Sequence, residues 1–200
     1  MDHLDCYPDP VTPTSRFGSP LVVQTGAVRL FVAAWPAEPV LRVLAGARPT
    51  EPTPDLRWVP PANWHVTLVF LGDVPDDEHD RLVEALRSVG ATTPHCTAVL
   101  GPETSVLGSR VLCVPVTGLD RLAATVRSST APFNRSSDSE EAFFGHLTLA
   151  RARRERSVPP AATGVSMCSA WPVSEIRLVS SAMGRQGAEY SPVALVTLDG

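Results

Sequence analysis

The sequence contains no lysine, so all 17 of its basic side chains other than histidine are arginines. Without lysine, the chain cannot use a lysine Schiff base, a lysine nucleophile or a lysine-containing phosphate loop. The formal net charge of −4 argues against a broad electrostatic surface for duplex nucleic acid. A small, local anion-binding site is compatible with this charge balance.

Cysteines are few and scattered. The chain has Cys6, Cys96, Cys113 and Cys168, with no Cys-x-x-Cys pair and no zinc-ligand spacing. We interpret them as buried or incidental thiols of a reducing compartment. The sequence also lacks an apolar run long enough to cross a bilayer, and a basic-then-apolar leader. These absences predict a cytoplasmic protein with no membrane association.

Two hundred residues, 44% of them hydrophobic and 19% charged, are enough to bury a sizeable core. Residues 1–27 are rich in Pro, Asp, Thr and Ser, and we expect them to form a mobile N-terminal extension. Residues 28–200 are expected to form a single domain. Within it, the order strand, helix, strand recurs in both halves, and short loops favour antiparallel neighbours. The pattern predicts a duplicated α+β fold.

The expected strands are residues 29–35, 56–59, 64–71, 96–100, 110–116, 143–150, 175–181 and 193–198. The expected helices are residues 36–47, a segment that begins near residue 76 and continues to 89, and residues 119–129. Residues 134–141 are expected to be a mobile polar loop, and residues 161–170 a connector with some strand character.

Two of these strands carry the same short motif. The first copy is His-Val-Thr-Leu at residues 65–68, and the second is His-Leu-Thr-Leu at residues 146–149. Because side chains alternate along a strand, His65 and Thr67 are expected on one face, and Val66, Leu68 and Phe70 on the other. His146 and Thr148 are expected to share a face in the same way.

Paired imidazoles and hydroxyls suit the cleavage of a phosphodiester. Histidine exchanges protons near neutral pH, so one ring can act as base while the other acts as acid. Threonine hydroxyls can donate to the phosphate oxygens and stabilise the charge that develops there. A single such histidine would more simply be a core or surface residue that hydrogen-bonds a carbonyl. The repetition in matching strands favours a functional site.

A metal site is the main rival use of two histidines. Neither motif has a carboxylate at ligand spacing, so we predict no metal and no other cofactor. Residues Arg151, Arg153, Arg154 and Arg156 could track an RNA backbone or form a solvated loop.

For the remaining aromatic and histidine candidates, a structural or surface role is favoured. Trp58, Trp64 and Phe144 could stack a base, although core packing is favoured. His79 and His95 are expected at the surface.

Several segments of the chain, taken together in their order, resemble the 2H phosphoesterases, and specifically the RNA 2′,3′-cyclic phosphodiesterases once named 2′-5′ RNA ligases. The resemblance begins near Val28 and runs to the end of the chain. The segments that carry it are residues 29–33, 58–72, 109–112, 143–151 and 190–193.

The resemblance implies a bilobal α+β fold, with two antiparallel β-sheets lining a central cleft, helices outside and one motif from each sheet. It implies metal-free hydrolysis of a terminal 2′,3′-cyclic phosphate to a 2′-phosphate. His146 would be the proton acceptor and His65 the proton donor. Thr67 and Thr148 would bind the phosphate.

Two positions near the second motif bear on this comparison. Arg151 matches an arginine that the family tends to carry after the second motif. Strict alternation places it opposite His146, so it contacts phosphate only if a bulge or the strand end turns it. Gly145 replaces the family's frequent proline and is expected to loosen the start of the strand.

The predicted protein is a monomeric cyclic phosphodiesterase whose partners are RNA ends bearing a 2′,3′-cyclic phosphate, or a small cyclic phosphate substrate. Two alternatives stay open. One is an enzyme of the same fold acting on nucleotide or ADP-ribose cyclic phosphates, and the other is a non-catalytic protein that binds RNA ends.

Overall fold

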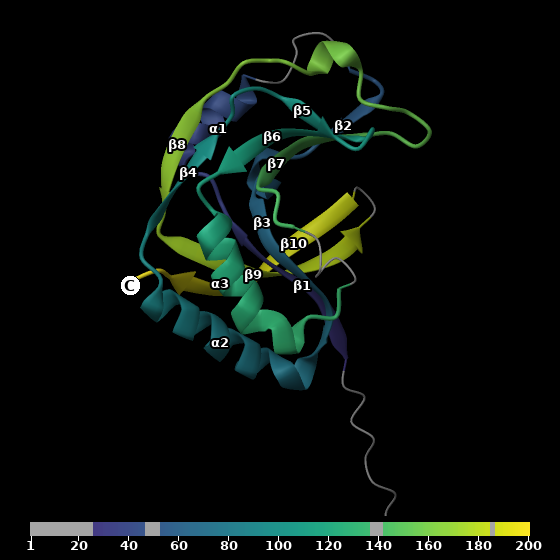
Figure 1. The fold of residues 1–200 in the computed structure, drawn as a ribbon. Coiled ribbons are helices and arrows are strands. Elements are labelled where there is room, and N and C mark those ends of the chain that lie inside the picture. Colours follow the sequence, from purple (N-terminus) through teal and green to yellow (C-terminus); the bar gives the residue numbers. More distant parts are fainter. Residues whose placement is uncertain (1–25, 47–52, 137–141, 185–186) are drawn as a thin grey trace, which may run out of the picture.

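The computed structural model describes residues 26–46, 53–136, 142–184 and 187–200 (Figure 1). The predicted extension, residues 1–27, therefore lies almost entirely outside the described residues, as do positions 137–141 of the predicted polar loop. The strands are β1 (Ala27–Ala34), β2 (Leu56–Trp58), β3 (Val66–Pro75), β4 (Cys96–Leu100), β5 (Ser105–Leu107), β6 (Val111–Thr117), β7 (His146–Ala152), β8 (Ser169–Val173), β9 (Glu175–Gly184) and β10 (Gly187–Thr197). The α-helices are α1 (Glu38–Ala45), α2 (His79–Thr92) and α3 (Asp120–Thr130), and short 3₁₀ turns occur at Pro61–Asn63, Asp76–Glu78, Ala131–Phe133 and Pro160–Ala162.

The strands form one curled antiparallel path in the order β10-β9-β1-β3-β7-β6-β4-β8, with β2 beside β7 and β5 beside β6. The two halves of this path meet where β3 and β7 share a single register pair, Val66 with Leu147. The α+β class and the antiparallel pairing are confirmed. The two expected sheets are joined at the strands that carry the two motifs.

The helices cover the outside of this curl. In Figure 1, α2 and α3 lie side by side, and α1 lies beside β8. Helix α2 contacts β10, and α3 contacts β3. Helix α2 buries Leu82, Leu86 and Val89, which follow the helical period of its apolar positions.

The two faces of the motif strands differ in character. Val66, Leu68, Leu147 and Leu149 belong to the main hydrophobic core and are at most 2% exposed. A second, small cluster of Phe31, Ala33 and Val179, with Trp35 and Tyr190 packed against it, is separate from that core. The larger core fixes the strands, which leaves the other face of each motif strand available for a site.

Several elements differ from expectation. Strand β8 begins within the expected connector, at Ser169. Strand β5 is not among the expected strands. Strand β10 begins at Gly187 rather than near residue 193. Strand β3 continues to Pro75, beyond the expected end. None of these differences changes the position of the two motifs.

Candidate active site

The single contact between β3 and β7 brings the two motifs together. Val66 and Leu147 are register partners and both are fully buried. Neighbouring residues on a strand point to opposite faces. The residues that flank Val66 and Leu147 therefore share the face opposite the core. They are His65, Thr67, His146 and Thr148, and all four are partly exposed. Thr67 and His146 line the same cavity, of about 320 Å³.

The two histidines are held by equivalent hydrogen bonds. His65 Nδ1 lies 2.7 Å from the Asn63 carbonyl oxygen, and His146 Nδ1 lies 2.8 Å from the Phe144 carbonyl oxygen. A carbonyl can only accept, so Nδ1 carries the proton in both rings. In the neutral form, Nε2 then carries the lone pair on each ring. Each Nε2 is thereby suited to accept a proton, or to donate one when the ring is charged.

The surroundings of His65 are aromatic and largely buried. Trp35 stacks on its ring at a centroid distance of 5.1 Å, Phe31 lies at 5.1 Å, and Tyr190 meets it edge-on at 5.3 Å. Burial lowers the pKa of His65 from 6.5 to about 4, against the raising effect of the Asn63 carbonyl. The charges of His146 and Arg151 lower it further. Both of these groups therefore lie close enough to His65 to disfavour its charged form.

His146 is more open. It stacks on Phe144 at a centroid distance of 5.7 Å, and the Phe144 ring is 52% exposed. The expectation that Phe144 packs in the core is wrong, because its side chain lines the cavity beside His146. Trp64 is a core residue, as favoured, and is 5% exposed. Trp58 is half-buried, lines a neighbouring cavity and donates to the Thr53 hydroxyl.

A β-bulge determines where Arg151 points. Ala150 pairs with Leu112 and Thr148 with Cys113, so Leu149 is an extra residue in β7. Leu149 and Ala150 are both buried, which shifts the alternation by one position and places Arg151 on the face of His146 and Thr148. Arg151 accordingly lines the cavity that holds His146 and Thr67.

The same irregularity occurs in β3. Val69 pairs with Val32 and Thr67 with Ala33, so Leu68 is an extra residue, and Leu68 and Val69 are both buried. The expectation that Phe70 shares the face of Leu68 is therefore wrong. Phe70 is 50% exposed and lines the cavity with Thr67. It lies five residues after His65, as Arg151 lies five residues after His146.

Gly145 does not loosen the start of the second motif strand. Its carbonyl accepts a 2.8 Å hydrogen bond from the Val116 amide. A Cβ atom at this position would lie 2.2 Å from the Val116 carbonyl oxygen. The glycine thus permits β7 to approach β6 closely immediately before His146.

The remaining candidates lie apart from this arrangement. His79 is near Asp76 and the Val74 carbonyl, and His95 is exposed. Arg156 pairs with Asp55 at 3.3 Å. Cys96, Cys113 and Cys168 are free thiols, and Cys6 lies outside the described residues.

Two absences hold for the described residues, which are 26–46, 53–136, 142–184 and 187–200. No group of three or more His, Cys, Asp or Glu side chains there could hold a metal ion. Within those same ranges, no helix is both long and apolar enough to cross a membrane.

Sequence reasoning missed the aromatic enclosure of His65. Phe31 in β1 and Trp35 just after it are four residues apart, so alternation places them on the same face. The residues between and before them, Leu30, Val32 and Ala34, belong to the main core. This alternation was a usable signal, but every residue of the run is apolar, so a strand buried on both faces fits it equally well.

Comparisons with known proteins agree with the geometry. The family model described as LigT like Phosphoesterase matches residues 32–100. An RNA 2′,3′-cyclic phosphodiesterase of Thermus thermophilus is 29% identical over 186 residues, covering 86% of this chain and 91% of the relative.

Solved structures similar to this chain include one from Thermus thermophilus and one of E. coli LigT. The Thermus thermophilus protein TT0787 superimposes with a TM-score of 0.72 at 25% identity, covering 85% of this chain and 97% of that one. E. coli LigT complexed with 3′-AMP gives a TM-score of 0.68 at 26% identity, covering 87% and 99%.

Proposed function

We propose that this chain, which is similar to LigT-like phosphoesterases in sequence and in structure, hydrolyses 2′,3′-cyclic phosphates at RNA ends to 2′-phosphates. One observation carries the proposal. Each imidazole is held by the same kind of hydrogen bond, from Nδ1 to a backbone carbonyl, and the two rings lie beside the register pair that joins β3 to β7. The name of the Thermus relative, RNA 2′,3′-cyclic phosphodiesterase, supports this substrate class, and the 3′-AMP bound to LigT is a nucleotide of related chemistry.

The proposed reaction requires one proton transfer on each side of the phosphorus. His146 Nε2 accepts a proton from water as the water oxygen bonds to phosphorus. The bond between phosphorus and the 3′ oxygen breaks, and His65 Nε2–H donates its proton to that oxygen. The 2′ oxygen remains on phosphorus. Each transfer typically contributes about a hundredfold to ten-thousandfold in rate.

Thr67, Thr148 and Arg151 would bind the phosphate. Their hydroxyl and guanidinium groups donate to non-bridging oxygens, where negative charge increases during attack. The bulge at Leu149 supports the inclusion of Arg151, because it brings the side chain to the histidine face.

The donor role of His65 depends on the substrate. With a pKa of about 4 in the free chain, His65 is neutral at pH 7. A bound phosphate anion favours the charged ring and raises this pKa. The substrate itself would therefore convert His65 into the acid.

The test is a mass-resolved assay on a short RNA that ends in a 2′,3′-cyclic phosphate. We expect the mass to increase by one water and the product to carry only a 2′-phosphate. His65→Asn and His146→Asn should each lower turnover by at least about a hundredfold, while His95→Asn, at an exposed site, should not. An unchanged substrate mass would indicate a binding protein, and turnover confined to ADP-ribose cyclic phosphates would indicate the other alternative.

We also propose that the reaction needs no metal, since the two imidazoles supply both proton transfers. Activity should survive chelation. Activity lost on chelation and restored by zinc would contradict this. The monomeric state, the cytoplasmic location and the single domain over residues 28–200 stay predictions.

A further inference from the structure

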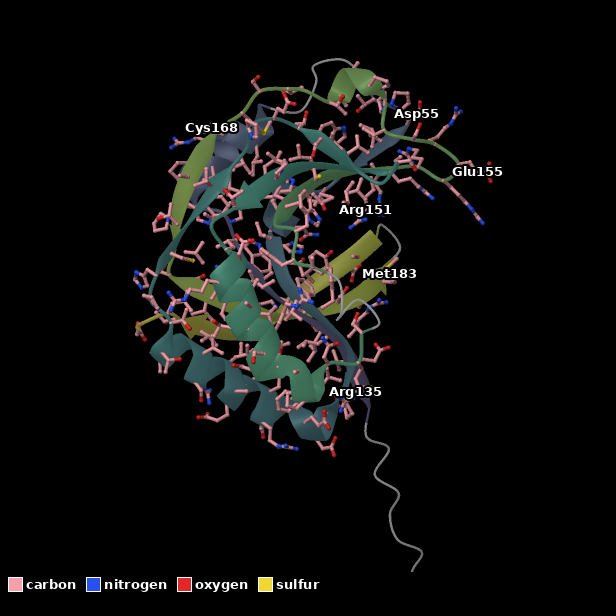
Figure 2. The ribbon with its side chains drawn as sticks, in the orientation of Figure 1. Asp55, Arg135, Arg151, Glu155, Cys168 and Met183 are labelled. Atoms are coloured by element: carbon pink, nitrogen blue, oxygen red, sulfur yellow. The ribbon has the colours of Figure 1, made fainter. Side chains whose placement is uncertain are left out.

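A second cavity, lined largely by arginines, adjoins the candidate active site. Its volume is about 500 Å³, and its cationic lining, called the arginine trough here, consists of Arg57, Arg110, Arg151, Arg153 and Arg154. Arg151 also lines the cavity that holds Thr67 and His146. A phosphate at the histidines would thus lie next to the trough. Figure 2 shows Arg151 between the β2–β7 strand pair and the β9–β10 hairpin, and this residue lines a cavity with residues 187–190 of β10.

Backbone pairing brings these arginines together from three segments. Arg151 on β7 is the register partner of Arg57 on β2 and of Val111 on β6. The Arg110 carbonyl accepts a hydrogen bond from the Ala152 amide at 2.8 Å. The Arg153 amide donates to the Asp55 carbonyl at 2.8 Å. The trough is therefore positioned by hydrogen-bonded neighbouring segments of the sheet rather than by one loop.

Two of the five guanidinium groups, those of Arg110 and Arg153, are braced by neutral carbonyls. Arg110 Nη2 donates to the Ala152 and Arg153 carbonyls at 3.3 Å, and Arg153 Nε donates to the Pro54 carbonyl at 2.7 Å. Each guanidinium has five N–H donors, so most of them stay available for a ligand. Such bracing reduces the entropy that each side chain loses when it binds.

Four of the trough's five arginines form no ion pair within the described part of the chain. They are Arg110, Arg151, Arg153 and Arg154. Arg156, by contrast, pairs with Asp55 and does not line the trough. The chain as a whole carries a net charge of −4, so this cluster is a local exception. Concentrated, preoriented arginines are typical of sites for phosphate groups.

On the basis of the proposed function, we infer that the arginine trough binds the phosphodiesters immediately upstream of the cyclic phosphate in single-stranded RNA. A cyclic mononucleotide has one phosphate, which the histidine site with Arg151 would occupy. The other arginines then have no phosphate to bind. A longer strand supplies those phosphates in a continuous chain, as grooves for single strands require. The enzyme would therefore prefer polymer ends to mononucleotides.

The test measures kcat/KM for a six-nucleotide RNA with a cyclic phosphate end, and for the corresponding cyclic mononucleotide. We expect the ratio of the two values to exceed about ten at low salt. If three phosphates are neutralised, the oligonucleotide value should fall about twentyfold from 50 to 200 mM salt, because the slope is about 0.7 per phosphate. The mononucleotide value should fall much less.

Three triple variants identify the cause. Arg110→Gln with Arg153→Gln and Arg154→Gln should reduce the ratio to near one and flatten the salt slope. The same three positions changed to Lys should keep the preference, because lysine retains the charge. Arg42→Gln with Arg87→Gln and Arg121→Gln, all exposed positions on helices, alters net charge equally and should keep the ratio.

Several results would overturn the inference. These are a wild-type ratio near one, a lysine triple as impaired as the glutamine triple, or a remote triple that loses the preference equally. Equal competition by polyglutamate and by RNA of matched length would also overturn it, since the trough would then be a general polyanion surface. If neither substrate is turned over at all, the proposed function fails instead.

Discussion

His65 and His146 make the same backbone hydrogen bond but lie in unlike surroundings. His65 is enclosed by Phe31, Trp35 and Tyr190, whereas His146 stacks on one exposed ring. Burial penalises the charged ring of His65 only where water is excluded. A site with near-equivalent motifs therefore contains two chemically different imidazoles.

The first prediction concerns the titration of His65. Followed by NMR of the imidazole nitrogens, His65 should titrate near pH 4 in the free chain, because burial lowers its pKa. Addition of a 2′-phosphorylated nucleotide should raise this value, since a nearby anion favours the charged ring. Titration near 6.5 in the free chain would contradict the effect of burial on His65, and no change with the nucleotide would contradict its conversion into an acid by the substrate.

The second prediction assigns the low pKa to the aromatic enclosure. Trp35→Leu should raise the pKa of His65 toward 6.5, because a smaller side chain admits water to the stacked face. Phe144→Leu is the matched control, since that ring stacks on His146. Equal shifts of His65 in both variants would show that the enclosure is not the cause.

At the scale of elements, alternation along a strand predicts the motif faces but not the bulges. His65, Thr67, His146 and Thr148 share a face as expected, because Val66 and Leu147 anchor the opposite face in the core. The extra residues Leu68 and Leu149 follow from pairing with β1 and β6, which is not written in the motif strands themselves. For this reason, the positions of Phe70 and Arg151 needed the structure.

The expected lengths of β8 and β10 are too short for the same reason. Strands β8 and β10 are the two ends of the sheet path, and they contain Pro172 and Pro192. Proline is tolerated in an edge strand, because the N–H that it lacks would face away from the sheet and is not needed for a hydrogen bond to another strand. The expected boundaries stop near both prolines, because the sequence alone does not reveal which strands are edges.

The third prediction tests the close approach of β7 to β6. Gly145→Ala would place a Cβ 2.2 Å from the Val116 carbonyl, so the strand must shift immediately before His146. We expect a loss of about 1–3 kcal/mol in the free energy of unfolding, measured with denaturant, together with reduced turnover. Gly46→Ala, where the nearest atom lies at 3.3 Å, is the matched control. Wild-type stability in Gly145→Ala would show that the contact is not constraining.

At the scale of the whole molecule, the candidate site lies where the two halves of the sheet meet. Only one register pair joins β3 to β7, and the core side chains beneath it are shared by both halves. The aromatic residues around His65 come from β1, β10 and the residue after β1. Unfolding removes this enclosure, so the protonation of His65 is linked to the stability of the fold.

The final prediction follows from this linkage. Between about pH 6.5 and pH 4, the unfolded chain binds a proton at His65 that the folded chain does not bind. The free energy of unfolding should therefore decrease as the pH falls through this range, by about 3 kcal/mol in total. Other groups also titrate there, so the measured quantity is the difference between the wild type and His65→Asn in denaturant melts. Asn can still donate to the Asn63 carbonyl but cannot titrate, so its stability should depend less on pH over this interval. Parallel curves for the two proteins would mean that His65 is hydrated in the folded state, and the buried aromatic site would be wrong.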